Sequence, residues 1–100
     1  MATLESVRIG GREVPVLVAA LIAQEADRLG ILPGQVGDVA LPDPPPTSVV
    51  IAGFRLSLVA GAHIAALADA EKLRPKKLLE KLVTEHAQAL ERRARRRERS

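Results

Sequence analysis

Few residues in this chain are suited to catalysis or metal binding. The two histidines, His63 and His86, stand far apart and have no carboxylate at zinc-motif spacing. The chain contains no cysteine, which excludes a thiol nucleophile and every cysteine-based zinc site. The glycines at 30, 34 and 37 are not followed by the Lys-Ser/Thr pair of a phosphate-binding loop. We therefore expect no enzyme activity, no metal and no cofactor.

Positive charge is the more informative chemistry in this sequence. Residues 1–48 hold three basic and six acidic residues, a balance of −3, whereas residues 49–100 hold twelve basic and six acidic residues, a balance of +6. The last ten residues read ERRARRRERS. Like charge gathered in one half favours a polyanionic partner. A solvated helix end followed by a charged tail is the alternative interpretation.

The composition limits the architecture that can carry this charge. One hundred residues make one domain or two very small ones. Hydrophobic residues make up 47% of the chain but Phe54 is the only aromatic, so the core is aliphatic and the composition is typical of helices. The first residues lack a basic segment followed by an apolar one, and the longest apolar run is about half of a bilayer span. We expect a cytoplasmic protein.

The first half of the chain predicts a short strand and one helix. Residues 7–9 form the expected strand, which ends at the two glycines 10 and 11. Residues 14–29 repeat apolar positions at close to the 3.6-residue helical period, and Gly30 is a typical stop. Three consecutive prolines within residues 42–48 predict a stiff spacer. We divide the chain into a helical segment 1–41, this spacer, a domain 49–90 and a basic tail 91–100.

The second half predicts a strand, a short helix and a long helix. Residues 49–58 pass from a β-branched run into strict alternation, which indicates one half-buried strand. A helix is expected over 60–73, and Pro75 is placed at the first position of a final helix that runs into the tail. That helix has one continuous apolar stripe: Leu78, Leu79, Leu82, Val83, His86, Ala87 and Leu90.

The segment FRLSLVAGAHIAALADAEKLRPKKLLEKLVTEHAQAL resembles the ribbon-helix-helix family of DNA-binding proteins, to which the Arc and MetJ repressors belong. The resemblance covers roughly residues 49–90. A lone strand leaves its hydrogen-bonding groups unpaired, and a unit of about forty residues closes no core alone, so a second copy is expected. The predicted fold is mainly α, with one short strand per protomer in a ribbon-helix-helix homodimer preceded by a helical segment.

The resemblance also implies roles for individual residues. Two paired strands would enter the major groove with Gly53, Arg55 and Ser57 facing the bases, and Arg55 would be the principal reader. The start of the second helix would hold DNA phosphate through Arg74, Lys76 and Lys77. The implied dimer core consists of Phe54, Leu56, Leu58, Leu78 and Leu82.

The predicted function is that of a sequence-specific DNA-binding transcriptional regulator, most simply a repressor. The main alternative is a protein-interaction module, of the antitoxin or plasmid-partition type, that binds a partner through helix 14–29. Ala26, Gly30 and Val36 also have helix-turn-helix spacing, but the segment that would read DNA there is acidic. A degenerate internal copy, in which Arg8 and Pro33 parallel Arg55 and Pro75, does not fit because the two intervals differ in length.

Overall fold

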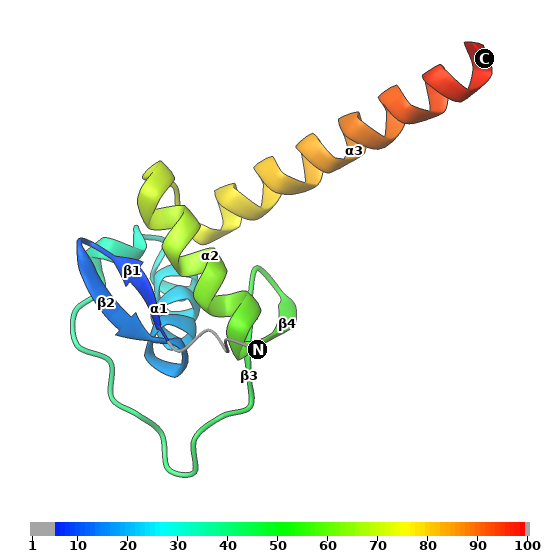
Figure 1. Cartoon of the computed structure of the whole chain (residues 1–100). Helices are drawn as coiled ribbons and strands as arrows, with labels where there is room; N and C mark the ends of the chain where they lie inside the picture. Colours follow the sequence, from blue (N-terminus) through cyan, green and yellow to red (C-terminus); the bar gives the residue numbers. More distant parts are fainter. Residues whose placement is uncertain (1–5, 100) are drawn as a thin grey trace.

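The computed structural model describes residues 6–99, and side chains over residues 6–97. Two short hairpins are each followed by a helix, and a long helix completes the chain (Figure 1). No helix in this described range is long and apolar enough to cross a membrane. The elements in chain order are β1 (Ser6–Ile9), β2 (Arg12–Pro15), α1 (Val16–Leu29), the short 3-10 helix η1 (Pro33–Gln35), β3 (Ser48–Ile51), β4 (Phe54–Ser57), α2 (Leu58–Glu71) and α3 (Pro75–Arg99).

The strands correct the predicted fold class. Among the described residues β1 pairs with β2 and β3 pairs with β4, in two separate antiparallel hairpins. The molecule is therefore an α/β protein, and the expectation of a mainly α fold with one short strand per protomer in a ribbon-helix-helix dimer was wrong. The three helices expected at 14–29, 60–73 and from 75 onward are present with small shifts at their ends.

The physical reason for the error lies in the middle of the predicted strand. Ala52 and Gly53 have φ angles of 52° and 82°, so the chain reverses there instead of continuing in extended conformation. Val50 consequently lies opposite Arg55 within one chain. β4 thus finds in β3 the hydrogen-bonding partner that a second copy was expected to supply.

The two halves are copies of one ββα unit. Moving residues 6–35 forward by 42 positions places them on residues 48–77 without a gap, so that each strand and helix coincides with its counterpart. Ten of the thirty pairs are identical. The weaker parallel noted in the sequence, between Arg8 and Arg55, was out of register with this one. The identical pairs are Ser6/Ser48, Val7/Val49, Ile9/Ile51, Gly11/Gly53, Ala20/Ala62, Ile22/Ile64, Ala23/Ala65, Ala26/Ala68, Asp27/Asp69 and Pro33/Pro75.

Each unit holds the hairpin turn of the other through an aspartate. Asp69 of α2 accepts a hydrogen bond from the backbone N–H of Gly10 at 2.7 Å, and Asp27 of α1 accepts one from that of Ala52 at 2.9 Å. Gly10 and Ala52 are equivalent positions of the repeat, as are the two aspartates. The two units therefore contact each other reciprocally, in an approximately twofold-symmetric way. Both contacts link residues that are far apart in sequence.

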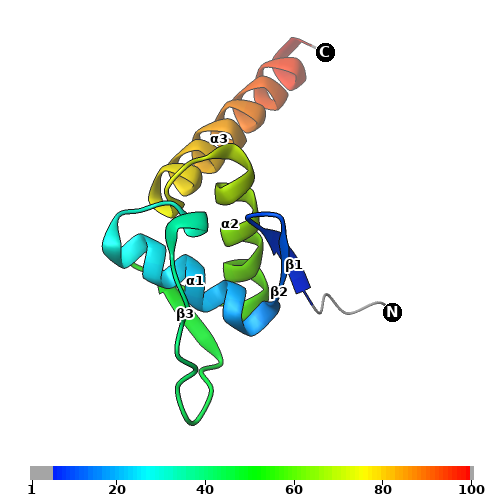
Figure 2. The same cartoon turned by 90° about the vertical axis from the view of Figure 1, so that its left-hand side faces the viewer.

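Small residues let α1 and α2 pack closely at the centre of the molecule. Both helices bury alanines along the shared face, and α1 and α2 lie side by side in both ribbon views (Figure 2). A side chain added at Gly61 would come within 3.1 Å of the Ala20 Cβ and 2.8 Å of a Val49 methyl carbon. The proline-rich segment 42–48 therefore connects two halves that share one core, in which Ile9, Val49, Ile51 and Leu78 are also buried.

Because the two aspartate contacts are equivalent, removing either aspartate should destabilise the protein by a similar amount. Asp27→Ala and Asp69→Ala should each lower the free energy of unfolding by about 1–3 kcal/mol, because a charge-assisted hydrogen bond is lost and a turn amide is left without its partner. Urea denaturation followed by circular dichroism measures this. Asp38→Ala, on an exposed coil, is the matched control and should change little. A loss at only one of the two sites would contradict the reciprocal contact.

Candidate nucleic-acid interface

The long helix α3 is anchored to the core only at its beginning. Pro75 and Leu78 are fully buried, and the Leu78 N–H donates to the Arg74 carbonyl oxygen at 3.0 Å. Proline suits a first helical turn because it needs no amide partner there. In the first unit the equivalent Pro33 begins only η1, because Gly34 and Gly37 follow and favour other conformations.

Beyond this anchor α3 leaves the body as a projecting arm. From residue 80 to residue 97 every position is exposed except Ala89, which is half-buried. The radius of gyration is 15.6 Å, larger than the value of about 13 Å typical of a compact chain of this length. Figure 1 shows the C-terminal turns of α3 far from all other elements. The second unit thus carries a helical arm that the first unit lacks.

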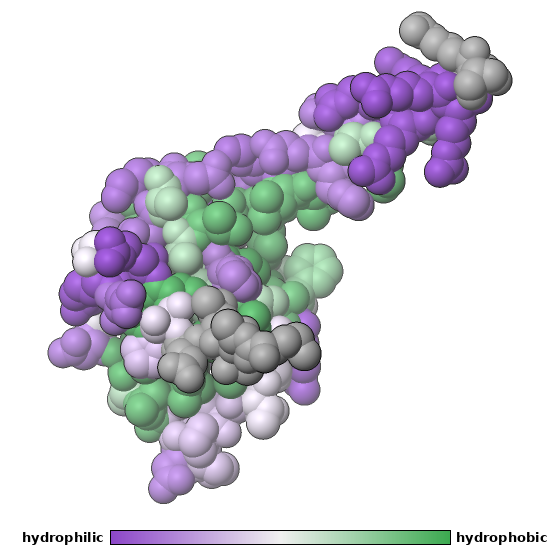
Figure 3. Space-filling model, viewed as in Figure 1, coloured by the Kyte–Doolittle hydropathy of each residue, from purple (hydrophilic) through white to green (hydrophobic). Residues whose placement is uncertain are grey.

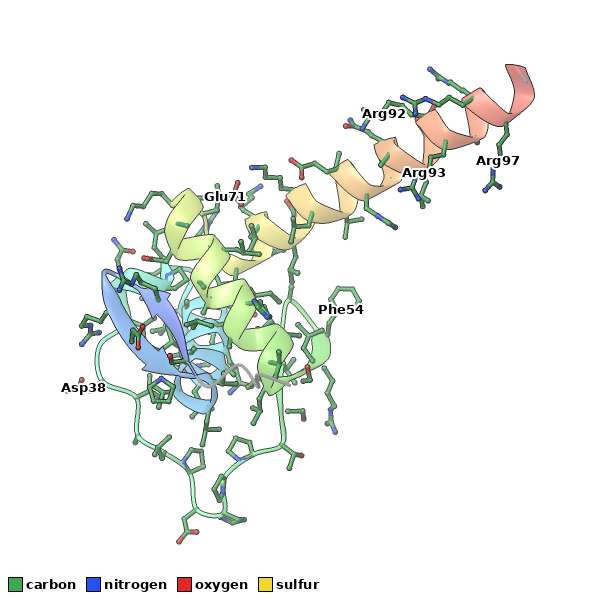
Figure 4. The ribbon with its side chains drawn as sticks, in the orientation of Figure 1. Asp38, Phe54, Glu71, Arg92, Arg93 and Arg97 are labelled. Carbon is green, nitrogen blue, oxygen red and sulfur yellow. The ribbon has the colours of Figure 1, made fainter. Side chains whose placement is uncertain are left out.

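The arm presents arginines on more than one side. Figure 4 shows Arg92 on the upper side of α3, and Arg93 and Arg97 on the lower side. Arg95 forms an ion pair with Glu91 at 2.8 Å. Arg96 stands three and four residues after Arg93 and Arg92, the spacing at which like charges on a helix repel. Unlike charges are scarce here, so an anion near this surface would relieve the repulsion.

The residues predicted to hold phosphate come together at the start of α3. Arg74, Lys76 and Lys77 line one cleft of about 260 Å³. Asp27 and Glu80 line it too, and Glu80 accepts a hydrogen bond from Lys77 at 3.5 Å. This cleft therefore carries both signs of charge, in contrast to the arm. Lys72, which was not among the predicted phosphate-binding residues, lines a neighbouring cleft together with Arg74 and Lys77. Its position close to these cations in the sequence was the signal that could have identified it.

The three residues predicted to read bases occupy different kinds of position in the structure. Arg55 is exposed on β4, and Ser57 lies two residues further along the same strand. The Ser57 hydroxyl caps α2 by accepting a hydrogen bond from the Ala60 N–H at 3.2 Å. Gly53 lies in the turn of the hairpin, before β4 begins. Arg55 is the cation that this strand offers to a partner.

The residues predicted to form a dimer core divide into two groups. Leu78 is completely buried within its own chain, and Leu56 and Leu58 are half-buried against the same core. Phe54 and Leu82 remain 65% and 38% exposed. The single chain thus closes most of the core that a second copy was expected to complete, and it leaves Phe54 and Leu82 outside.

Two surface ion pairs fix side chains on either side of this region. Lys81 of α3 donates a hydrogen bond to Glu71 at the end of α2, which raises the pKa of Lys81 above its ordinary value. Arg28 donates to Glu25 on α1 and thereby lowers the pKa of Glu25. Both pairs are exposed, so screening by water and salt leaves them a small effect on stability. The pair between Lys81 and Glu71 matters for position, because it links the first turns of α3 to the end of α2.

The described part of the chain holds no group of three or more His, Asp or Glu side chains that could bind a metal ion. His63 and His86 are both exposed and lie on different helices. Comparison with known proteins finds no matching family, no matching curated protein and no matching solved structure. The case for a function therefore depends on the geometry and charge of the molecule itself.

The charge pattern of the arm predicts unequal effects for two neighbouring arginines. Arg96→Ala removes two repulsive pairs and should increase the helicity of the arm, by about 0.2–0.5 kcal/mol for each pair. Arg95→Ala removes the favourable pair with Glu91 together with one repulsive pair, with Arg92, and should therefore raise helicity less than Arg96→Ala does. Amide hydrogen exchange of residues 88–95 measures both changes. Equal responses of the two variants would contradict the assignment of repulsion to Arg96.

Proposed function

We propose that the protein is a double-stranded DNA-binding regulator whose main contact surface is the basic part of α3. The observation that carries this proposal is the set of exposed arginines on a helix that projects from the body. Binding to phosphate releases the counterions of DNA and relieves the repulsion within the helix. The two halves of the chain hold equal numbers of acidic residues, so the excess of basic residues after residue 48 is what makes the second half positive. The arginines concerned are Arg92, Arg93, Arg95, Arg96 and Arg97.

The shape of the arm favours duplex DNA as the polyanion. The major groove of B-DNA is wide enough for an α-helix, and its two walls are phosphate backbones. A helix with cations on opposite sides can contact both walls, and Arg92 and Arg93 point to different sides of α3 (Figure 4). The expected cytoplasmic location stays part of this proposal.

A protein partner at helix 14–29 is less well supported. That alternative requires an apolar helix face open to a partner. In the structure α1 buries Leu21, Ile22 and its alanines against α2 and the hairpins. The exposed apolar residue Leu29 stands alone at the end of the helix, and a single exposed leucine is ordinary on a protein surface.

Two charge-matched double variants test the arm. Arg92→Gln with Arg96→Gln should weaken binding to a 25-base-pair duplex at least tenfold near 50 mM salt. The slope of log affinity against log salt should fall by about 1.8, since two phosphate contacts are lost. Fluorescence anisotropy at several salt concentrations measures both quantities.

The control removes the same charge from the other half of the chain. Arg8→Gln with Arg12→Gln alters two exposed arginines of the first hairpin and should leave affinity and slope nearly unchanged. If both double variants lose the same affinity, binding follows net charge alone and the arm is no specific contact surface. If neither the wild type nor the variants bind duplex DNA, the proposed function is wrong.

We extend the proposal to sequence preference through Arg55. An arginine can donate two hydrogen bonds to guanine O6 and N7, a contact that contributes about 1–3 kcal/mol of discrimination. Selection from random duplexes by the wild type should yield a preferred site, and Arg55→Ala should weaken that preference while binding to unselected DNA changes less. An equal loss on both DNAs would assign Arg55 to phosphate or to solvent.

A further inference from the structure

An apolar groove lies between α3 and the second hairpin. Phe54, Leu79 and Val83 line this groove, which has a volume of about 370 Å³. Phe54 and Val83 are 65% and 68% exposed. Figure 4 shows Phe54 extending from the hairpin toward the space below α3, and Figure 3 shows apolar residues along this side of the helix. The only aromatic residue of the chain is thus presented to the outside.

The internal repeat shows that the fold does not need this aromatic. The position equivalent to Phe54 in the first unit is Arg12, at the start of an equally formed hairpin. Gly37 occupies the position equivalent to Leu79. The same hairpin therefore forms with a polar residue in place of Phe54, whereas Gly37 lies in coil because the first unit has no counterpart of α3. Phe54 and Leu79 form an apolar surface that the second unit has and the first unit lacks. An apolar surface that the fold does not require indicates an interaction with a partner.

The groove continues along α3 as a seam of regular spacing. Leu79, Val83, His86 and Leu90 are separated by four, three and four residues. This is the heptad spacing of helices that pair with another helix. Leu90 is 49% exposed, and Figure 1 shows the later turns of α3 away from the other described elements. An apolar seam on a projecting helix needs a covering helix.

We propose that a second copy of the chain covers this seam, with the two α3 helices antiparallel. Within the described chain α1 and α2 cover each other, so α3 is the helix with a free heptad seam. Covering the seam and Phe54 on both copies would bury roughly 1,000 Å² in total, which reaches the lower range of stable interfaces. The proposal is independent of DNA binding, since it uses the apolar side of α3.

Charge decides the orientation of the pair. Parallel helices would place Arg93 and Arg97 of both copies against their own counterparts. Antiparallel helices separate the two basic ends by roughly 30 Å, several Debye lengths at physiological salt. Each basic end then meets the first turns of the other α3, a region of mixed charge in which Glu71 and Glu80 stand among Arg74, Lys76 and Lys77, instead of another purely basic end. In this register Leu90 lies opposite the partner's Leu79, beside Phe54, and fills the groove.

Sedimentation velocity of the full chain at about 50 μM tests the pairing. The wild type should sediment at twice the chain mass of 10.7 kDa. Val83→Glu should weaken the dimer at least tenfold, whereas Gln88→Glu, which adds the same charge on the opposite face of α3, should not. Phe54→Arg should also weaken it, and this variant keeps the fold because the first unit carries Arg12 in the same place. Circular dichroism verifies folding of each variant.

Single cysteines determine the orientation, because the chain contains none of its own. Leu79→Cys and Leu90→Cys, mixed and mildly oxidised, should form the mixed disulfide, and neither variant alone should cross-link efficiently. A cross-link of Leu90→Cys with itself would overturn the antiparallel arrangement. A monomeric wild type, or a dimer that Val83→Glu and Phe54→Arg leave unchanged, would overturn the proposal.

Discussion

The close packing of α1 against α2 is the constraint on which the rest of the molecule depends. Alanines and Gly61 bring the two helices together, and the hairpins close over them with Val49 and Ile51 buried. This contact uses the apolar faces of both helices within one chain. α3 then contacts the core only with its first turns, where Leu78 is fully buried and Leu79 is half-buried. The projection of α3 is a consequence of a core that is already full.

The difference between the two units explains how a symmetric core carries an asymmetric surface. Both units reach the same proline after the same helix end, at Pro33 and Pro75. Glycines follow the first proline, and good helix formers follow the second. The first unit ends there in η1 and coil, and the second extends into α3 with its cations. Charge, the apolar seam and the exposed Phe54 all belong to the second unit.

The sequence predicted the helices well because their periodicity and end signals are local. Pro15, Gly30 and Pro75 fall at or beside the observed helix ends. The second hairpin was missed because alternation continues through its turn, where Ala52 adopts a positive φ that alanine rarely takes. Asp27 supports that turn from the other unit, an interaction that no local pattern reveals. The expected ribbon-helix-helix dimer depended on an unpaired strand, and β3 removed that premise.

The residue types of the candidate site could be predicted from the sequence, but their arrangement in space could not. Clustered cations in the second half indicated a polyanion, and the apolar stripe from Leu78 to Leu90 was visible in the spacing. Tertiary packing decides which residues of this stripe the core covers, and Leu78 is the one that is fully buried. The register of the repeat was equally hidden, because ten identities in thirty are spread among alanines and short aliphatic residues.

Nuclear magnetic resonance titration of the full chain with a short DNA duplex is the most direct measurement of where DNA binds. If DNA binds the projecting helix, chemical-shift changes should be concentrated in α3 beyond Leu90, with smaller changes near Arg55 and almost none on the first hairpin. Broad changes over β1 and β2, or an arm whose signals stay unchanged at saturating DNA, would contradict the assignment of the projecting helix as the contact surface.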